Sequence, residues 1–270
     1  MSSIWLLRGN HRVFGSWALV LAWVAILSLA AAGVAAEPDQ AELIALLSGE
    51  DVAAKAAEHG FVPLVEGSSL AGWKRFPWFE GHWVARDGVI SCDGQLKVKR
   101  GQERNLWTEK EYADFVLVAD WRLTGEPKLA ERNAFAPEGH FLVDADGKRV
   151  RHKILDAGDS GIYLRGSGRY QVNIWSQPMG SGDINSYHKD LKLPPETRRT
   201  YVPKKNADKP FGQWNRFVIT MIGDRVSVVL NGQIVIDRAV LTGAAPRGPI
   251  ALQNHGDPVE FRNLYIKELD

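Results

Sequence analysis

Short alternating segments separated by tight turns are the feature of this sequence that most restricts its fold. From residue 61 onward, apolar and polar side chains alternate over runs of a few residues, as in residues 115–121 and 225–230. Asn231-Gly232, between two such runs, is a strong signal for a two-residue hairpin turn. About a dozen short strands at this spacing, with few helical patterns between them, are typical of an antiparallel sandwich or barrel.

The extent of the strand-rich part, residues 61–270, favours a sandwich. We therefore predict an all-β domain over these residues, folded as a two-sheet antiparallel jelly roll. Two long connections, residues 124–158 and 176–213, interrupt the pattern. Connections of this length in a compact domain are usually functional or disordered, so we expect the second to help wall a binding site.

The first 36 residues have the composition of a secretory signal peptide. Arg8 and Arg12 precede an uncharged apolar run at residues 17–32, and residues 34–36 (Val-Ala-Ala) supply the small side chains of a cleavage site. The alternative is an uncleaved anchor, because the run is close to the ~20 residues that a membrane span needs. We expect cleavage, no membrane span afterwards, and a periplasmic or extracellular location.

Residues 37–60 are expected to form a short helical segment before the strands begin. Asp39 is placed to cap it, Leu43 and Leu47 follow a helical spacing, and Gly60 ends the pattern. We interpret this segment as packing or tethering structure rather than as part of a site.

Composition and motifs exclude several functional classes. A single Cys leaves no disulfide scaffold and no multi-cysteine zinc or iron–sulfur site. A net charge of +1 over 270 residues gives no basic surplus, so we expect no nucleic-acid partner. The sequence also lacks the spacings of zinc proteases, calcium-binding loops, nucleotide-binding loops and serine hydrolases.

Side-chain parity places a polar and aromatic set on one face of residues 170–175. Val172 must point into the core, so Gln171, Asn173 and Trp175 point to the opposite side. Amides can bind vicinal hydroxyls as donor and acceptor, and an indole offers a plate for the apolar face of a pyranose. The pattern favours a saccharide-binding face, with an ordinary solvated sheet face as the alternative.

Neighbouring strands extend this set. By the same parity, Asp159, Tyr163 and Arg165 share the face, and Gln253 and His255 come from a strand near the C-terminus. The imidazole of His255 can accept a proton near neutral pH, which makes it a candidate base. His188, in the second long connection, is a further candidate for ligand contact.

The same segments resemble a known bacterial family, the 3-keto-disaccharide hydrolases, also described as 3-keto-α-glucoside-1,2-lyase/3-keto-2-hydroxyglucal hydratase. The resemblance covers about residues 61–269 and implies a concanavalin A-like fold of the lectin and glucanase type, in agreement with the strand pattern. The segments that carry it are residues 61–64 (FVPL), 70–73 (LAGW), 159–166 (DSGIYLRG), 170–174 (YQVNI), 212–215 (GQWN), 230–232 (LNG), 248–256 (GPIALQNHG) and 259–264 (VEFRNL).

The resemblance implies a reaction on 3-keto-glycosides. A ketone at C3 acidifies the C2 proton, so a base removes it, the C1 substituent leaves and water adds to the enone. In this chain Asp159 or His255 would be the base and Arg165 would stabilise the enolate. Contacts to a saccharide or 3-keto-saccharide ligand would come from Tyr163, Gln171, Asn173, Trp175, His188 and Gln253.

The family often has Tyr-Glu-Val-Gln where this chain has Tyr-Gln-Val-Asn at residues 170–173. An amide keeps the hydrogen bonding of a carboxylate but takes no proton at neutral pH. Two other hypotheses therefore stay open: a non-catalytic carbohydrate-binding module of the bacterial envelope, and a structural envelope protein. No cofactor is specified, and the need for a divalent metal is left open.

Overall fold

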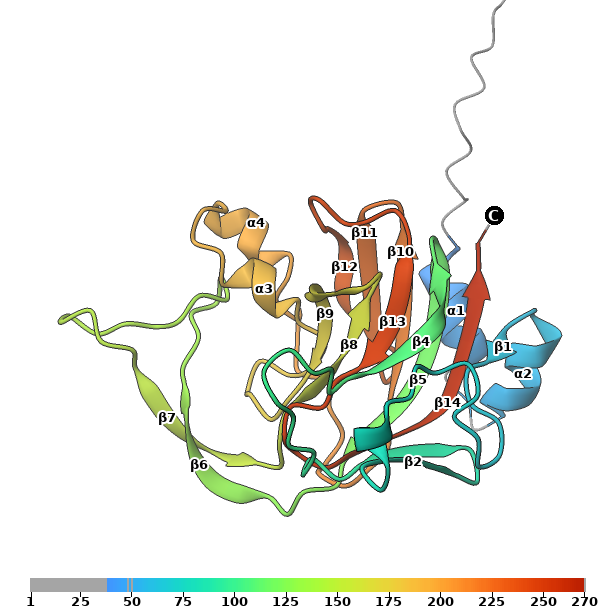
Figure 1. Cartoon of the computed structure of the whole chain (residues 1–270). Helices are drawn as coiled ribbons and strands as arrows, with labels where there is room; N and C mark the ends of the chain where they lie inside the picture. The colour runs from blue at the N-terminus through green and yellow to red at the C-terminus, as the bar shows by residue number, and fades with distance from the viewer. Residues whose placement is uncertain (1–37, 48, 50, 270) are drawn as a thin grey trace, which may run out of the picture. The chain divides into compact units, whose positions relative to one another are not determined.

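The computed structural model describes residues 38–47, 49 and 51–269, and the expected leader at residues 1–36 lies outside this range. Strands dominate the described part of the chain (Figure 1). None of its helices has the length and apolar composition that crossing a membrane requires. The helices are α1 Gln40–Leu47, α2 Val52–Glu58, α3 Asn185–His188 and α4 Pro195–Arg199, with a 3-10 turn at Pro77–Phe79.

The larger of two packed sheets has eight antiparallel strands within the described residues. Seven follow the order β12-β11-β10-β5-β14-β3-β2, and β1 pairs with β14. Consecutive strands β10, β11 and β12 are neighbours because tight turns join them. The strands are β1 Val62–Pro63, β2 Trp83–Arg86, β3 Val89–Cys92, β5 Phe115–Leu123, β10 Asn215–Ile222, β11 Arg225–Leu230, β12 Gln233–Val240 and β14 Val259–Glu268.

The smaller sheet has four strands in the order β4-β13-β8-β9, namely β4 Leu106–Tyr112, β13 Gly248–Leu252, β8 Ser160–Leu164 and β9 Ser167–Ile174. Its inward side chains, such as Val172 and Leu252, belong to one buried cluster with Phe217 and Phe261 of the larger sheet. Burying each such side chain contributes about 1.5–3 kcal/mol. The predicted two-sheet antiparallel sandwich is confirmed.

The hairpin between β11 and β12 has the predicted turn. Asn231 and Gly232 have φ values of 51° and 77°, both in the left-handed region that a type I′ turn requires. Asn231 also contributes its side chain, because its Oδ1 accepts a hydrogen bond from the backbone N–H of Arg216 on β10.

The helices α1 and α2 cover the outer face of the larger sheet. Leu43 and Leu47 pack in one cluster with Val116 and Val118 of β5, so this strand is buried on both faces. The Asp39 carboxylate accepts a hydrogen bond from the backbone N–H of Ala41, which is the predicted cap. The lead-in is helical as predicted, but it consists of two helices rather than one.

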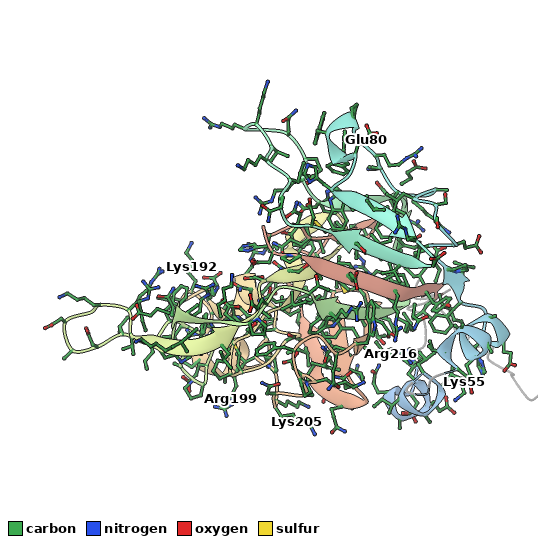
Figure 2. The ribbon with its side chains drawn as sticks, turned by 90° about the horizontal axis from the view of Figure 1, so that it is seen from below. Lys55, Glu80, Lys192, Arg199, Lys205 and Arg216 are labelled. Atoms are coloured by element: carbon green, nitrogen blue, oxygen red, sulfur yellow. The ribbon has the colours of Figure 1, made fainter. Side chains whose placement is uncertain are left out.

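Arg216 on β10 fastens this helical segment to the sheet. Its Nη1 donates to the carbonyls of Leu47 at 2.8 Å and Gly49 at 2.6 Å. The same guanidinium also binds the buried carboxylate of Asp120 on β5. Figure 2 shows Arg216 beside the N-terminal helices. The segment before the sandwich is therefore held by directed hydrogen bonds as well as by apolar contacts.

The connection at residues 124–158 is a structured arm rather than an irregular loop. It contains β6 Lys128–Asn133 and β7 Arg151–Asp156, which pair with each other as a separate two-stranded sheet (Figure 1). Sequence reasoning missed this hairpin because half of the residues in its strands are charged and none of these strand residues is buried. It missed β4 as well, where the strand ends in the polar run Thr-Glu-Lys-Glu before Tyr112.

Candidate active site beside the smaller sheet

The outer face of the smaller sheet carries an aromatic and amide row. Trp107 on β4 and Tyr163 on β8 are both paired with Ala251 on β13, and Tyr163 is paired in turn with Gln171 on β9. The rings of Trp107 and Tyr163 lie 5.8 Å apart across the small alanine. Because Val172 faces the core, the predicted parity of this strand is correct.

A hydrogen-bonded network fixes the polar members of this face. The Nε2 group of Gln171 donates to Asn173 Oδ1 and Gln253 Oε1, both at 2.8 Å, and to the Ser160 carbonyl at 3.1 Å. The Nε2 group of Gln253 donates to the Tyr163 hydroxyl at 2.7 Å. These bonds leave Gln171 Oε1 and the Tyr163 O–H proton without partners among the described residues, and both remain available to a ligand.

Gly161 makes this network possible. It is paired with Asn173 and lies beneath the Gln171 side chain. A Cβ atom at this position would lie 2.2 Å from Gln171 Nε2. Only a residue without a side chain therefore allows the Gln171 amide to lie flat against the sheet.

Asp159 precedes β8 at one end of this face and lines a cavity of about 290 Å³. The His255 imidazole, from the loop after β13, lies on the same cavity with its Nδ1 3.9 Å from Asp159 Oδ2. The structure brings these two residues, which the sequence analysis placed on one sheet face, to the same cavity. The other residues that line the cavity are Arg132, Asn133, Phe135, Phe141, Ile154, Asp156, Gly158, Trp175, Ser176, Gln177, Lys189 and Asp257.

The environment of Asp159 disfavours its charged form. Although a third of its side chain is exposed, burial raises the pKa of this carboxyl to about 7, and the charges of Asp183 and Asp257 act in the same direction. The positive charge of Lys189 acts against this rise. A carboxyl group with a pKa near 7 is suited to accept and release a proton at neutral pH.

His255 is shifted in the direction opposite to Asp159. Burial lowers its pKa, the charge of Arg104 lowers it further, and Asp257 partly compensates. Half of its side chain is exposed. The imidazole is therefore neutral at pH 7 and able to accept a proton from a group entering the cavity.

Lys189 supplies a cation that the sequence analysis did not single out. Its ammonium lies over three rings, 5.2 Å from the centroid of Phe135, 5.0 Å from Phe141 and 5.6 Å from Trp175. Its Nζ makes no hydrogen bond or ion pair with any residue that the structure describes. Burial lowers the pKa of Lys189, whereas Asp183 and Asp159 raise it. The sequence offered one indication for Lys189: it lies in the connection at residues 176–213, which we expected to help wall a binding site.

The arm contributes a second missed group of residues. Arg132 on β6 forms an ion pair with Asp156 on β7, and both line the cavity beside Asp159. The rings of Phe135 and Phe141, from the arm's loop, pack against each other 5.1 Å apart. Because the arm was predicted as an irregular connection, none of these side chains could be assigned to the site.

Arg165 does not belong to the site, and its predicted role as enolate stabiliser is wrong. The strand ends at Leu164, and Arg165 adopts a φ of 45° in the turn that follows, so strand parity no longer applies. Its buried guanidinium donates to the carbonyls of Ala113, Gly223 and Ala245 and binds the Asp114 carboxylate. Arg165 therefore ties three turns of the fold together.

His188 and Asn173 are too buried to touch a ligand, which corrects two predicted substrate contacts. The His188 side chain is fully enclosed, with Nε2 2.8 Å from Asp183 Oδ2 and Nδ1 bonded to the Gly139 carbonyl at 2.5 Å. Asn173 is 1% exposed. His188 supports the wall of the cavity, and Asn173 positions Gln171.

Trp175 lies beside the cavity, but not as an open plate. It is only 8% exposed, and its Nε1 donates to the Gly180 carbonyl at 2.8 Å. Its ring packs 5.3 Å from that of Phe135, on the side where Lys189 also lies. The predicted stacking surface is therefore largely covered by the arm and the second connection.

No group of three or more His, Cys, Asp or Glu side chains at metal-binding spacing occurs within residues 38–47, 49 and 51–269. The titratable groups that line this cavity are three carboxyl groups, one imidazole, one ammonium and one guanidinium.

Known proteins share this architecture. A curated relative, the 3-keto-disaccharide hydrolase of Bacteroides thetaiotaomicron, is 24% identical over 253 residues, which cover 78% of this chain and 79% of that protein. A solved structure from Parabacteroides distasonis, provisionally named a glycosyl hydrolase, has a TM-score of 0.51 at 20% identity and covers 77% of this chain and 84% of its own. A second from the same organism has a TM-score of 0.50 at 17% identity, with coverages of 88% and 100%.

The solved structures support the sandwich fold, and the family assignment rests on a domain match. The 3-keto-alpha-glucoside-1,2-lyase-like domain matches residues 60–267, which is most of the chain and includes the cavity residues described above. This chain therefore belongs to the 3-keto-alpha-glucoside-1,2-lyase-like domain family.

Proposed function

We propose that this protein cleaves 3-keto-glycosides by removing the C2 proton and expelling the C1 substituent. The observation that carries the proposal is the position of Asp159, a carboxyl group with a pKa of about 7 in a cavity that also holds Lys189 and His255. The name of the Bacteroides thetaiotaomicron relative supports the choice of substrate.

Asp159 acts as the base in the first half of the reaction. Its carboxylate takes the proton from C2, and the C2–H electrons form a C2–C3 double bond while the C3 carbonyl oxygen becomes an enolate. When the enolate collapses back to a ketone, a C1–C2 double bond forms and the C1–O bond breaks. The departing oxygen takes a proton, which the protonated Asp159 can return because its pKa is close to neutral pH.

Lys189 takes the role that the sequence analysis gave to Arg165. Its ammonium is enclosed by aromatic rings and has no hydrogen-bond acceptor among the described residues, so it can donate to the enolate oxygen as charge develops. A donor aimed at a developing oxyanion typically contributes a factor of about 10²–10³ in rate.

His255 acts in the second half of the reaction. Water adds across the enone, with its oxygen bonding to C1 and a proton going to C2. The neutral imidazole of His255, 3.9 Å from Asp159, can take the proton of the incoming water. The imidazolium passes this proton to the Asp159 carboxylate, which delivers it to C2, so both groups return to their starting states.

Binding of the sugar ring falls to the outer face of the smaller sheet. The Tyr163 O–H and the Gln171 Oε1 are a donor and an acceptor whose positions are fixed by Gln253. Burial raises the pKa of Tyr163, which keeps its phenol protonated and able to donate. The ring of Trp107 beside them offers an apolar surface to a pyranose.

The alternative function is carbohydrate binding without turnover. The amide and aromatic row alone favours it, because that row needs no proton transfer to hold a sugar. Incubation with 3-keto-trehalose, followed by measurement of released glucose, separates the two. We expect release by the wild-type protein and none by Asp159→Asn; binding of the sugar by both proteins, with release by neither, would show a binding module instead.

We also propose that the protein works in the periplasm or outside the cell, because of the signal-peptide pattern at residues 1–36. N-terminal sequencing of the native protein tests this. We expect the mature chain to start near residue 37, whereas an intact Met1 in the membrane fraction would indicate an uncleaved anchor.

A further inference from the structure

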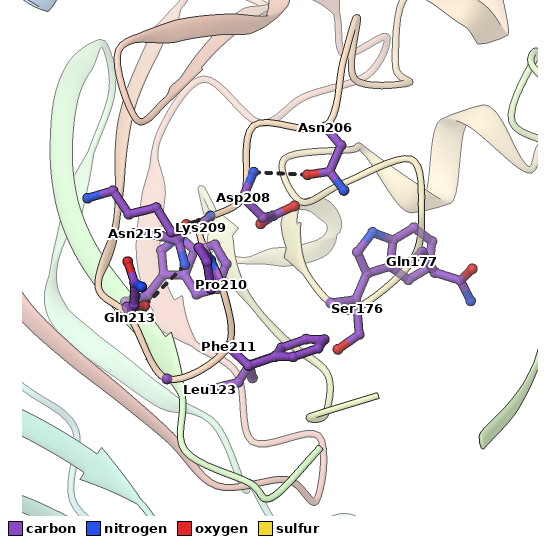
Figure 3. Close-up of a pocket in the computed structure, with 13 residues that line it drawn as sticks. Leu123, Ser176, Gln177, Asn206, Asp208, Lys209, Pro210, Phe211, Gln213 and Asn215 are labelled. Atoms are coloured by element: carbon purple, nitrogen blue, oxygen red, sulfur yellow. Dashed lines mark hydrogen bonds between the residues drawn. The ribbon is translucent and has the colours of Figure 1, made fainter. Parts of the chain in front are cut away.

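A second cavity of about 470 Å³ lies beside the candidate active site (Figure 3). Its wall includes Trp175, Ser176 and Gln177, and the same three consecutive residues also line the cavity of Asp159. The two cavities therefore share a wall that is formed by one short piece of chain. The remaining lining residues are Trp121, Leu123, Asn206, Asp208, Lys209, Pro210, Phe211, Gly212, Gln213 and Asn215.

We propose that this second cavity binds the leaving-group sugar of a 3-keto-disaccharide while the ketone-bearing ring lies against Asp159. The inference rests on the proposed function and adds to it a subsite for the group that leaves. It follows from three features of the cavity: an exposed aromatic ring, an exposed amide side chain, and a wall shared with the reaction site.

The exposed ring is that of Phe211. Its side chain is 45% exposed, and it is the one aromatic ring among the exposed large apolar side chains of the described residues. Gly212 follows with a φ of 77°, a left-handed conformation that lets the chain turn immediately after the ring. Figure 3 shows the Phe211 ring pointing away from its own loop and toward Ser176. An aromatic ring in this position suits the apolar face of a pyranose.

The polar lining suits hydroxyl groups. The exposed side chain of Gln213 offers an amide donor and an amide acceptor. Asp208 accepts a hydrogen bond from the Ser181 backbone N–H through Oδ2, which fixes its side chain in the wall. An amide at the rim of a cavity can pair with sugar hydroxyls as both donor and acceptor.

The loop that carries these groups is held in place. The Asn215 Oδ1 atom accepts hydrogen bonds from the Lys209 backbone N–H and from Asn231 Nδ2, both at 2.8 Å. The Asn206 Oδ1 atom accepts one from the Asp208 backbone N–H at 2.9 Å. Because these bonds fix the loop before any ligand arrives, little ordering cost opposes binding.

The charges of the cavity favour a neutral sugar. Lys209 and Asp208 are the charged residues in its lining, and they offset each other. Neither an anionic nor a cationic leaving group would gain a net attraction there. A neutral hexose matches both the hydroxyl-binding groups and the Phe211 ring.

The test compares two substrates that share the ketone-bearing ring and differ in the group that leaves. We measure kcat and KM for 3-keto-trehalose and for methyl 3-keto-α-glucoside with wild type, Phe211→Ala and Gln213→Ala. We expect Phe211→Ala to lower kcat/KM for the disaccharide about tenfold, mainly through KM, because a stacked ring contributes up to about 1.5 kcal/mol. The methyl glycoside should be cleaved as well by this variant as by wild type.

Leu191→Ala is the matched control, because Leu191 is a 71% exposed apolar side chain outside this lining. This variant should cleave both substrates with the kcat and KM of wild type. Equal losses on both substrates with Phe211→Ala, or no loss on the disaccharide, would overturn the subsite. A wild-type protein that cleaves neither substrate would instead overturn the proposed function, and the subsite with it.

Discussion

The Nδ1 atom of His255 lies 3.9 Å from Oδ2 of Asp159, yet the two residues do not behave as a stabilised ion pair. An ion pair would lower the pKa of the acid and raise that of the imidazole. Here burial raises the pKa of Asp159 to about 7 and lowers that of His255. Desolvation is the largest cause of both shifts, and it favours the neutral form of each group.

The first prediction concerns the pH dependence of cleavage. If the Asp159 carboxylate is the base, kcat/KM rises with pH and levels off above its pKa of about 7. Steady-state rates on 3-keto-trehalose between pH 5 and 9 measure this limb. Asp159→Asn should abolish cleavage over this pH range, whereas Asp146→Asn, in the exposed part of the arm, should leave the pH profile unchanged. A plateau reached already at pH 5 would contradict the assignment.

The second prediction concerns stability at the same residue. Folding disfavours the charged form of a carboxyl whose pKa is higher in the folded protein than in the unfolded chain. The fold therefore loses stability as pH rises from about 4 through 7 and this carboxyl ionises. Asp159→Asn should therefore increase the free energy of unfolding at pH 8. With a third of the side chain exposed, we expect a gain on the order of 1 kcal/mol. Urea unfolding at pH 8 and pH 4 tests this, because the gain should vanish at the lower pH.

The third prediction concerns the lysine among the aromatic rings. Lys189→Met keeps an unbranched apolar chain against Phe135 and Phe141 but removes the cation. We expect kcat to fall about 100-fold with a small change in KM, because the lost interaction is with the enolate rather than with the bound ketone. Lys192→Met, an exposed lysine of the same connection shown in Figure 2, is the control. An unchanged kcat in Lys189→Met would remove Lys189 from the mechanism.

Strand parity explains how much of the site could be predicted from the sequence. In β9 the apolar residue Val172 alternates with Gln171 and Asn173, and the structure puts Val172 in the core and Gln171 on the outer face. Parity also placed Asp159 and His255 on one face, and the structure puts both on one cavity. These predictions succeeded because a one-residue shift of register would have moved every apolar side chain out of the core.

The predictions that failed lie where alternation carries no information. Arg165 was counted as a strand residue, but the strand turns immediately before it. His188 and Lys189 are adjacent in one helical connection, and only the packing of the arm decides which is enclosed and which reaches the cavity. The arm's strands have little apolar content, so their pairing was not visible in the sequence.

The fourth prediction tests the room that Gly161 provides. Gly161→Ala should displace the Gln171 amide, because the added Cβ would lie 2.2 Å from its Nε2 atom. The Gln171 side chain can move, so we expect the fold to survive and KM to rise about tenfold as the acceptor Oε1 loses its position. Thermal unfolding and steady-state kinetics measured together check this. A normal KM would show that Gln171 makes no contact with the sugar.

The last prediction separates structure from catalysis at Arg165. Its side chain is 1% exposed, bonds three carbonyl groups and pairs with Asp114, whose side chain is 21% exposed. Arg165→Met leaves that carboxylate and those carbonyls without their donor, which should cost about 3 kcal/mol of unfolding free energy in urea. Because Arg165 does not line the cavity of Asp159, kcat per folded molecule should stay at the wild-type value. Arg165→Lys keeps the charge but not the forked geometry, so it should lose less stability. An Arg165→Met protein that is as stable as wild type but has a lower kcat would show that Arg165 acts in the reaction.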